Sequence, residues 1–300
     1  QTSGNARYVD IVENCLYNSI LSGISLDGKR YFYTNPLRIS ADLPYTLRWP
    51  KQRTEYISCF CCPPNTLRTL CEVQNYVYTL SDEGVWCNLY GGSELDTEWM
   101  GNHIQLLQET DYPWDGAVSI TLKEVPEKKP LSLFLRVPEW CTKATLAVND
   151  VPVTTDLKAG TYAEIKRIWK KGDRVAFVMG MEPVLLESHP LVEETRNQVA
   201  VKRGPVVYCL ESMDVEAGKR IDDILIPADI KFSPVKTEIA GSRVTVLDGI
   251  AHSVDSDSWE GKLYRKVAEN GDRIPIRLIP YYAWGNRGES EMTVWMLLER

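Results

Sequence analysis

The spacing of hydrophobic residues changes partway along the chain. Within 8–20 and 67–78, apolar residues recur at intervals of three and four, which predicts two amphipathic helices. Gly23 is predicted to end the first helix, and Asn65 is predicted to cap the second. Between the helices, Asp27-Gly28 separates two short apolar runs and predicts a tight hairpin.

Beyond Gly84 the apolar residues alternate with polar ones, a period of two that is typical of half-buried strands. Short strands separated by Gly, Pro, Asn and Asp, with no helices between them, indicate a β-sandwich. The predicted strands are 118–122, 131–137, 144–148, 163–167, 174–178, 184–187, 198–210, 244–247, 274–279 and 293–297.

The length of 300 residues, 44% of them hydrophobic, predicts more than one domain. Two helices offer each other too little surface to bury their apolar stripes, so a region upstream is expected to be their partner. The sequence begins at Gln1 with a helical pattern running by Tyr8, so we expect an N-terminal part of the same protein to precede it.

The charge balance narrows the choice of partners. Lys and Arg number 34 against 41 Asp and Glu, a net charge of -7 that argues against nucleic acid and suits a neutral ligand such as a sugar. No apolar run approaches the roughly 20 residues that a membrane helix needs, so we expect a soluble protein. Because a leader could precede Gln1, cytoplasmic and periplasmic locations both remain open.

The chain contains eight cysteines and is too long to need a disulfide scaffold. Cys15 and Cys71 lie on apolar helical stripes, and Cys87 and Cys209 lie in strand-like runs. These four are predicted to be buried small hydrophobic residues, and Cys141 to be structural as well.

The remaining cysteines, Cys59, Cys61 and Cys62, stand within four residues directly before the second predicted helix. The positive end of a helix dipole favours anions, so a thiol held there should ionise readily and become a nucleophile or a zinc ligand. The residues leave three alternatives open. The cysteines could simply pack, they could form a structural zinc site, or they could supply a catalytic thiolate beside a metal.

The sequence resembles glycoside hydrolase family 127, whose members are retaining β-L-arabinofuranosidases, and less closely family 146. The resemblance spans nearly the whole chain. It rests on Ala6-Arg7-Tyr8, Leu16-Tyr17-Asn18, Gly23 with Ser25-Leu26-Asp27-Gly28, Phe32-Tyr33-Thr34-Asn35-Pro36-Leu37, the Cys-Cys-Pro-Pro-Asn run at 61–65, Leu135-Arg136-Val137-Pro138-Glu139-Trp140, Arg203-Gly204-Pro205-Val206-Val207-Tyr208 and Pro280-Tyr281-Tyr282-Ala283-Trp284-Gly285-Asn286-Arg287-Gly288.

The resemblance implies a zinc-dependent enzyme that acts on an arabinose-containing oligosaccharide or glycan. It implies that Cys61 is the nucleophile and also contacts Zn²⁺, and that Cys62 is a second zinc ligand. Tyr33 is expected to contact substrate, with core packing as the alternative, and Cys59 is either close to the metal ligands or simply buried.

The resemblance also implies a Glu-x-Cys motif that completes the zinc site and a separate acid/base glutamate, both upstream of the cysteine pair. Glu13-Asn14-Cys15 has the letters of that motif but lies on the apolar helical stripe, so neither role is assigned to it. With two assigned ligands and no assigned acid, this chain alone is expected neither to hold zinc tightly nor to hydrolyse glycosides.

The fold expected from these features is multidomain α + β, with the terminal helices of an (α/α)6 barrel followed by one or two β-sandwich domains. Residues 1–82 would form the barrel part, 83–212 a β-sandwich, and 213–300 a second sandwich or the completion of the first. The alternatives of another class are a non-catalytic carbohydrate-binding or interdomain module and a structural zinc protein. Adjacent thiols at a helix N-terminus favour the enzyme, because a binding module does not need them.

Overall fold

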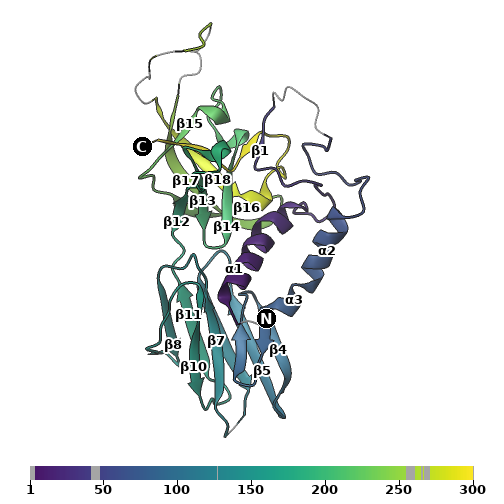
Figure 1. Ribbon diagram of the computed structural model, residues 1–300, viewed down its shortest axis with the longest axis vertical. Coiled ribbons are helices and arrows are strands. Elements are labelled where there is room, and N and C mark those ends of the chain that lie inside the picture. The colour runs from purple at the N-terminus through teal and green to yellow at the C-terminus, as the bar shows by residue number, and fades with distance from the viewer. Residues whose placement is uncertain are drawn as a thin grey trace. The chain divides into compact units, whose positions relative to one another are not determined.

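The computed structural model describes residues 4–41, 48–126, 128–254, 261–264, 266 and 271–299 (Figure 1). The chain divides into two compact units. Unit 1 comprises Gln1–Leu16 and Leu67–Glu182, and unit 2 comprises Tyr17–Thr66 and Pro183–Arg300. The predicted boundary at 212 therefore lies inside unit 2. No helix in the described ranges is long and apolar enough to cross a membrane.

The first helical segment begins with α1 (Ala6–Asn14) and continues as a π-helix, η1 (Cys15–Ile20). Asn5 caps it by accepting a hydrogen bond from the Arg7 backbone N–H at 3.0 Å. Gly23 ends the segment, as predicted. The hairpin predicted at 27–28 is present as a tight turn in which Gly28 has a φ of +74°.

The predicted apolar stripe of α1 is only partly buried. Tyr8 and Ile11 are more than half exposed, whereas Glu13 is 1% exposed. The physical reason is that α1 packs in unit 1 through the Glu13 carboxylate, which pairs with the buried guanidinium of Arg136. Hydrophobic periodicity places a glutamate on the solvent-facing side of a helix, so it does not identify the face of α1 that is buried.

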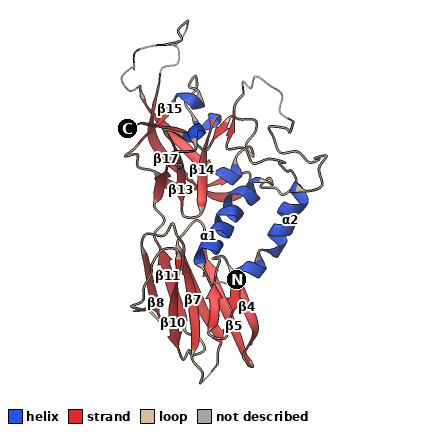
Figure 2. Ribbon diagram, in the orientation of Figure 1, coloured by secondary structure: helices blue, strands red, loops and turns tan. Residues whose placement is uncertain are grey.

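Unit 1 contains two sheets, and most of its other described residues are in loops and helices (Figure 2). Tyr90 contacts Phe177 of the larger sheet, with 5.8 Å between the rings, and its hydroxyl donates to the Arg136 carbonyl of the smaller one, so apolar faces of the two sheets meet. The smaller sheet has the order β10 (Thr161–Arg167), β7 (Leu131–Val137), β3 (Gly84–Cys87), β2 (Tyr78–Leu80); the larger has the order β4 (Ser93–Trp99), β5 (Asn102–Thr110), β6 (Ala117–Glu124), β11 (Arg174–Met179), β8 (Ala144–Val148), β9 (Val151–Pro152).

Unit 2 is built on one ten-stranded sheet. Its pairings form a closed ring, β13-β14-β18-β17-β15-β20-β13, because β13 pairs with both β14 and β20. β1, β12, β16 and β19 attach to this ring. The strands are β1 (Arg38–Ile39), β12 (Pro183–Leu186), β13 (Gln198–Arg203), β14 (Val206–Glu211), β15 (Ile224–Pro227), β16 (Ser233–Ile239), β17 (Ser242–Ser253), β18 (Arg273–Pro280), β19 (Met292–Thr293) and β20 (Met296–Glu299).

The chain is thus mostly β, as the alternation of its sequence indicates, and each predicted strand overlaps an observed one. The predicted run 198–210 is split into β13 and β14 by a turn at Gly204, which has a φ of +56°. Cys87, Cys141 and Cys209 are buried, as predicted. Cys15 and Cys71 are exposed, so their predicted burial is wrong: an apolar periodicity marks one face of a helix but does not ensure that this face is buried.

Candidate metal centre

The segment that leads to the cysteines is anchored in unit 2 by a buried arginine. Arg53 is 6% exposed and donates hydrogen bonds to the carbonyls of Ser22, Tyr282 and Trp284, at 2.9 and 3.0 Å for the first two. Its guanidinium lies over the Phe32 ring, 4.4 Å from the centroid. Thr54 pairs with Tyr31 through reciprocal backbone hydrogen bonds of 2.9 and 3.0 Å. The backbone is therefore held in place at Arg53, six residues before Cys59.

The cysteines end at the first turn of α2 (Cys62–Glu72). The prediction that Asn65 caps this helix is wrong, because the helix begins at Cys62 and Pro63 and Pro64 belong to its first turn. Proline has no N–H, and its fixed φ suits helical positions whose N–H would in any case lack a partner. The Asn65 N–H makes a 3.0 Å hydrogen bond to the Cys61 carbonyl, so Cys61 stands just before the helix and Cys62 is its first residue.

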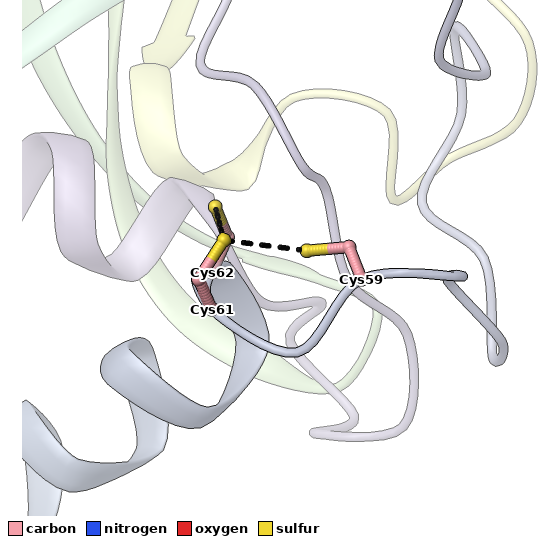
Figure 3. A group of neighbouring side chains, drawn as sticks. All are labelled: Cys59, Cys61 and Cys62. Atoms are coloured by element: carbon pink, nitrogen blue, oxygen red, sulfur yellow. Dashed lines mark hydrogen bonds between the residues drawn. The ribbon is translucent and has the colours of Figure 1, made fainter.

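Figure 3 shows that the three thiols converge. The Sγ atoms of Cys59 and Cys61 are 3.6 Å apart, those of Cys61 and Cys62 are 3.5 Å apart, and all three lie within 4.8 Å of one another. All three cysteines are free thiols. Cys61 is exposed, and the other two are partly exposed. Three sulfurs at these separations form a cluster that could hold a metal ion.

The three thiols are not electrostatically equivalent. Hydrogen bonds from the backbone N–H groups, first that of Cys62, lower the pKa of Cys59. Burial, followed by the neighbouring Cys61 thiol, raises the pKa of Cys62 to about 11. The general expectation that a thiol here ionises easily therefore agrees with the lowered pKa of Cys59, whereas the raised pKa of Cys62 opposes its ionisation near neutral pH.

Tyr33 lies in the same electrostatic environment. The negative charges of Cys61 and then Cys62 as thiolates raise the pKa of its hydroxyl, so Tyr33 lies within electrostatic range of the cluster. Its ring stacks on Trp49 with 3.9 Å between centroids. Tyr33 is partly exposed rather than in the core. Its role in substrate binding stays a prediction.

The donor set suits a thiophilic cation. Zinc binds thiolate sulfur at about 2.3 Å and prefers four tetrahedral ligands, so two sulfurs on one ion are roughly 3.8 Å apart. The 3.5 and 3.6 Å separations approach that value without disulfide contact, which would need about 2.0 Å. Cys61 and Cys62 are therefore able to share one ion.

Glu13, to which no metal role was assigned, is engaged within unit 1. Its Oε1 pairs with Arg136 and accepts a hydrogen bond of 2.6 Å from the Tyr112 hydroxyl. Arg53 and Trp49 are site-forming residues that the sequence did not reveal. A single Arg among polar neighbours carries no periodic signal, and its carbonyl partners at 282 and 284 lie more than two hundred residues away.

Comparisons with known proteins agree along almost the whole chain. Residues 1–75 match the GH127 β-L-arabinofuranosidase catalytic domain, 84–181 the GH127 middle domain, and 183–297 the glycoside hydrolase family 127 C-terminal domain. A non-reducing end β-L-arabinofuranosidase of Bifidobacterium longum subsp. longum is 30% identical over 96% of this chain and 45% of its own length.

Solved structures give the same result. A glycoside hydrolase is 66% identical with a TM-score of 0.96, over 99% of this chain and 49% of its own. A GH127 β-L-arabinofuranosidase from Geobacillus stearothermophilus T6 is 36% identical with a TM-score of 0.89, over 99% of this chain and 47% of its own. The chain thus spans about half the length of these relatives. Because it matches the catalytic, middle and C-terminal domains in their order, this chain belongs to glycoside hydrolase family 127.

Proposed function

We propose that the protein to which this chain belongs is a glycoside hydrolase that removes β-L-arabinofuranosyl residues from an arabinose-containing glycan with retention of configuration. The observation that carries the proposal is the convergence of Cys59, Cys61 and Cys62 at the start of α2, in a region matching the family's catalytic domain. Relatives named as β-L-arabinofuranosidases support the choice of sugar.

In this proposal Cys61 is the nucleophile, because it is the exposed thiol of the pair and lies directly before the helix. Its sulfur bonds to the anomeric carbon as the bond from that carbon to the leaving oxygen breaks, and a general acid gives the leaving oxygen a proton. Water then attacks the same carbon and releases the sulfur, so two inversions retain the configuration.

Cys61 and Cys62 would hold Zn²⁺. The ion, when bound, supplies positive charge that keeps a thiol deprotonated at neutral pH, which the raised pKa of Cys62 otherwise opposes. The acid/base glutamate and the Glu-x-Cys ligands implied by the family are proposed to come from outside these 300 residues. The helical segments 6–22 and 62–77 are proposed to complete an (α/α)6 barrel there.

Tyr33 is proposed to contact the sugar. It lies within electrostatic range of the cysteine cluster, it is partly exposed, and its ring stacks on Trp49. Tyr33→Phe in the full-length protein keeps the stacked ring and removes only the hydroxyl. We expect a fall in kcat/KM without loss of bound metal, and unchanged kinetics would rule out a hydroxyl contact.

The central test is Cys61→Ser in the full-length protein, assayed on an aryl β-L-arabinofuranoside. A neutral hydroxyl is a far weaker nucleophile than a thiolate, so turnover should be abolished while the circular dichroism spectrum is retained. Cys71→Ser is the matched control, because it removes an exposed thiol from α2, the helix that follows Cys61. Near wild-type turnover in Cys61→Ser would exclude the mechanism.

A further inference from the structure

Unit 2 contains a cavity of about 330 Å³ that shares no residue with the cysteine cluster. Three parts of the chain line it: residues 39–41 and 51–52 of the stretch that leads to the cysteines, Ser212 directly after β14, and the loop 284–291. Ligand sites in proteins begin at about 300 Å³. The volume therefore suits a small ligand rather than an extended glycan.

Hydrogen bonds between distant segments hold the walls of this cavity. The Ser212 and Ser290 hydroxyls lie 3.0 Å apart. Glu291 accepts a hydrogen bond of 2.8 Å from the Ala41 N–H, 250 positions away in sequence, and the Lys51 ammonium donates to the Ala41 carbonyl at 3.0 Å. The cavity is therefore preformed by tertiary contacts, as small-molecule sites usually are.

One residue of the lining carries a buried donor without an acceptor. Trp284 is 2% exposed, and its indole N–H has no hydrogen-bond partner among the described residues. Its ring stacks on Phe32 with 4.8 Å between centroids. Four other tryptophans donate their indole N–H to a protein acceptor: Trp86, Trp99, Trp140 and Trp169. A buried donor left unpaired is unfavourable, and an acceptor on a ligand would remove that cost.

We infer that the cavity binds one small neutral sugar, and that Trp284 donates its indole N–H to an oxygen of that sugar. A sugar hydroxyl both donates and accepts hydrogen bonds. The lining offers matching groups in the Gln52 amide and in the hydroxyls of Ser212 and Ser290. Ile39 adds an apolar surface for the C–H groups of a sugar ring.

The charges of the lining argue against an anionic ligand. Glu289 and Glu291 outnumber Lys51, whose ammonium already donates to two backbone carbonyls. An anion such as phosphate would therefore meet net negative charge, whereas a neutral ligand rich in hydroxyls would not. The choice of L-arabinose as the sugar rests on the proposed function, but the cavity and its unpaired donor do not depend on it.

The test measures binding of L-arabinose to the full-length protein by saturation-transfer NMR titration. Trp284→Phe keeps an aromatic ring and removes the N–H, so binding should weaken about 2- to 12-fold, as expected for one lost hydrogen bond. Trp295→Phe is the matched control and should leave the affinity unchanged, because Trp295 lies in the same unit but does not line the cavity. Ala41→Leu, at an exposed residue of the lining, fills the cavity and should abolish binding there even if Trp284→Phe does not fold.

Crystals of the full-length protein soaked in L-arabinose locate the sugar. We expect it in the cavity, with an oxygen within hydrogen-bond distance of Trp284 Nε1. Water alone in the cavity, or binding at crystal concentration only, would overturn the inference. If Tyr33→Phe loses arabinose binding and Ala41→Leu keeps it, the sugar binds only near the cysteines, so the inference fails and the proposed function stands. If arabinose binds in the cavity of a protein that hydrolyses no arabinofuranoside, the proposed function fails and the inference stands.

Discussion

The buried ion pair of unit 1 allows a prediction of defined size. Arg136 is 0% exposed and is held by the Glu13 carboxylate, by Asp10 at 2.5 Å and by the Asn88 carbonyl at 2.5 Å. Glu13 also accepts hydrogen bonds from the Tyr112 hydroxyl at 2.6 Å and from the indole N–H of Trp140 at 3.2 Å. This network joins α1 to β7 and its following loop within the unit.

Glu13→Gln preserves the size of the side chain but removes its charge, leaving the buried guanidinium with Asp10 alone. Burial raises the pKa of Asp10 despite the nearby Arg136, so Asp10 is a poor substitute for the lost carboxylate. Removing one partner of a buried pair typically costs about 3–5 kcal/mol. We expect a loss of that order in the free energy of unfolding of unit 1.

The assay is urea unfolding followed by circular dichroism and by tryptophan fluorescence, to which Trp140 contributes. Glu109→Gln, on an exposed position of β5, is the matched control and should stay within about 0.5 kcal/mol of wild type. Arg136→Met combined with Glu13→Gln should cost less than the two single changes added together, because the double variant no longer leaves a buried guanidinium without Glu13. A loss below about 1 kcal/mol in Glu13→Gln would refute the reasoning.

Three further predictions concern single residues. Hydrogen bonds, first from Ser25, lower the pKa of Asp27 from 3.8 to about 2. The stabilisation of its turn should therefore be complete above pH 3.8 and be lost as the pH falls through about 2. Asp27→Asn should abolish this pH dependence, measured by amide hydrogen exchange. Gly84→Ala would place a Cβ 1.9 Å from a backbone oxygen of β7, which should lower the stability of the protein by about 1–3 kcal/mol or more. In Gly92→Ala the new Cβ meets nothing within 4 Å, so thermal unfolding should be nearly unchanged. Arg53→Met leaves buried carbonyls unpaired at roughly 1–3 kcal/mol each, so an unchanged urea midpoint would count against its anchoring role.

The strands that sequence patterning missed show where that method fails. β4 was not predicted because its exposed face carries Glu94, Asp96 and Glu98, which leaves few apolar residues to alternate. Strands with a strong apolar face, such as β6 and β7, were predicted almost to their ends. An edge strand whose exposed face is charged therefore escapes this kind of detection.

In the candidate site, too, some features could be predicted from local sequence and others could not. The cluster of thiols was visible because Cys59, Cys61 and Cys62 are adjacent in sequence, and the backbone of a few residues limits how far apart their sulfurs can lie. The Arg53 anchor joins residues more than two hundred positions apart, at 53, 282 and 284, so no local pattern indicates it. The capping prediction fails at Asn65 because Pro63 and Pro64 already lie in the first turn of the helix, where a missing N–H costs no hydrogen bond.

The anchoring of the cysteine segment bears on how the proposed chemistry is positioned. Little regular structure precedes the cysteines in residues 48–61, and such a segment loses conformational entropy when its sulfurs must stay in one arrangement. Two constraints limit that loss: Arg53, bound to carbonyls on either side of Ala283, and the proline-containing first turn of α2. With both ends fixed, eight residues separate Arg53 from Cys62. Loosening the Arg53 end should therefore weaken metal binding before it unfolds the sheet of unit 2, because the sulfurs depend on that anchor and the strand pairings do not.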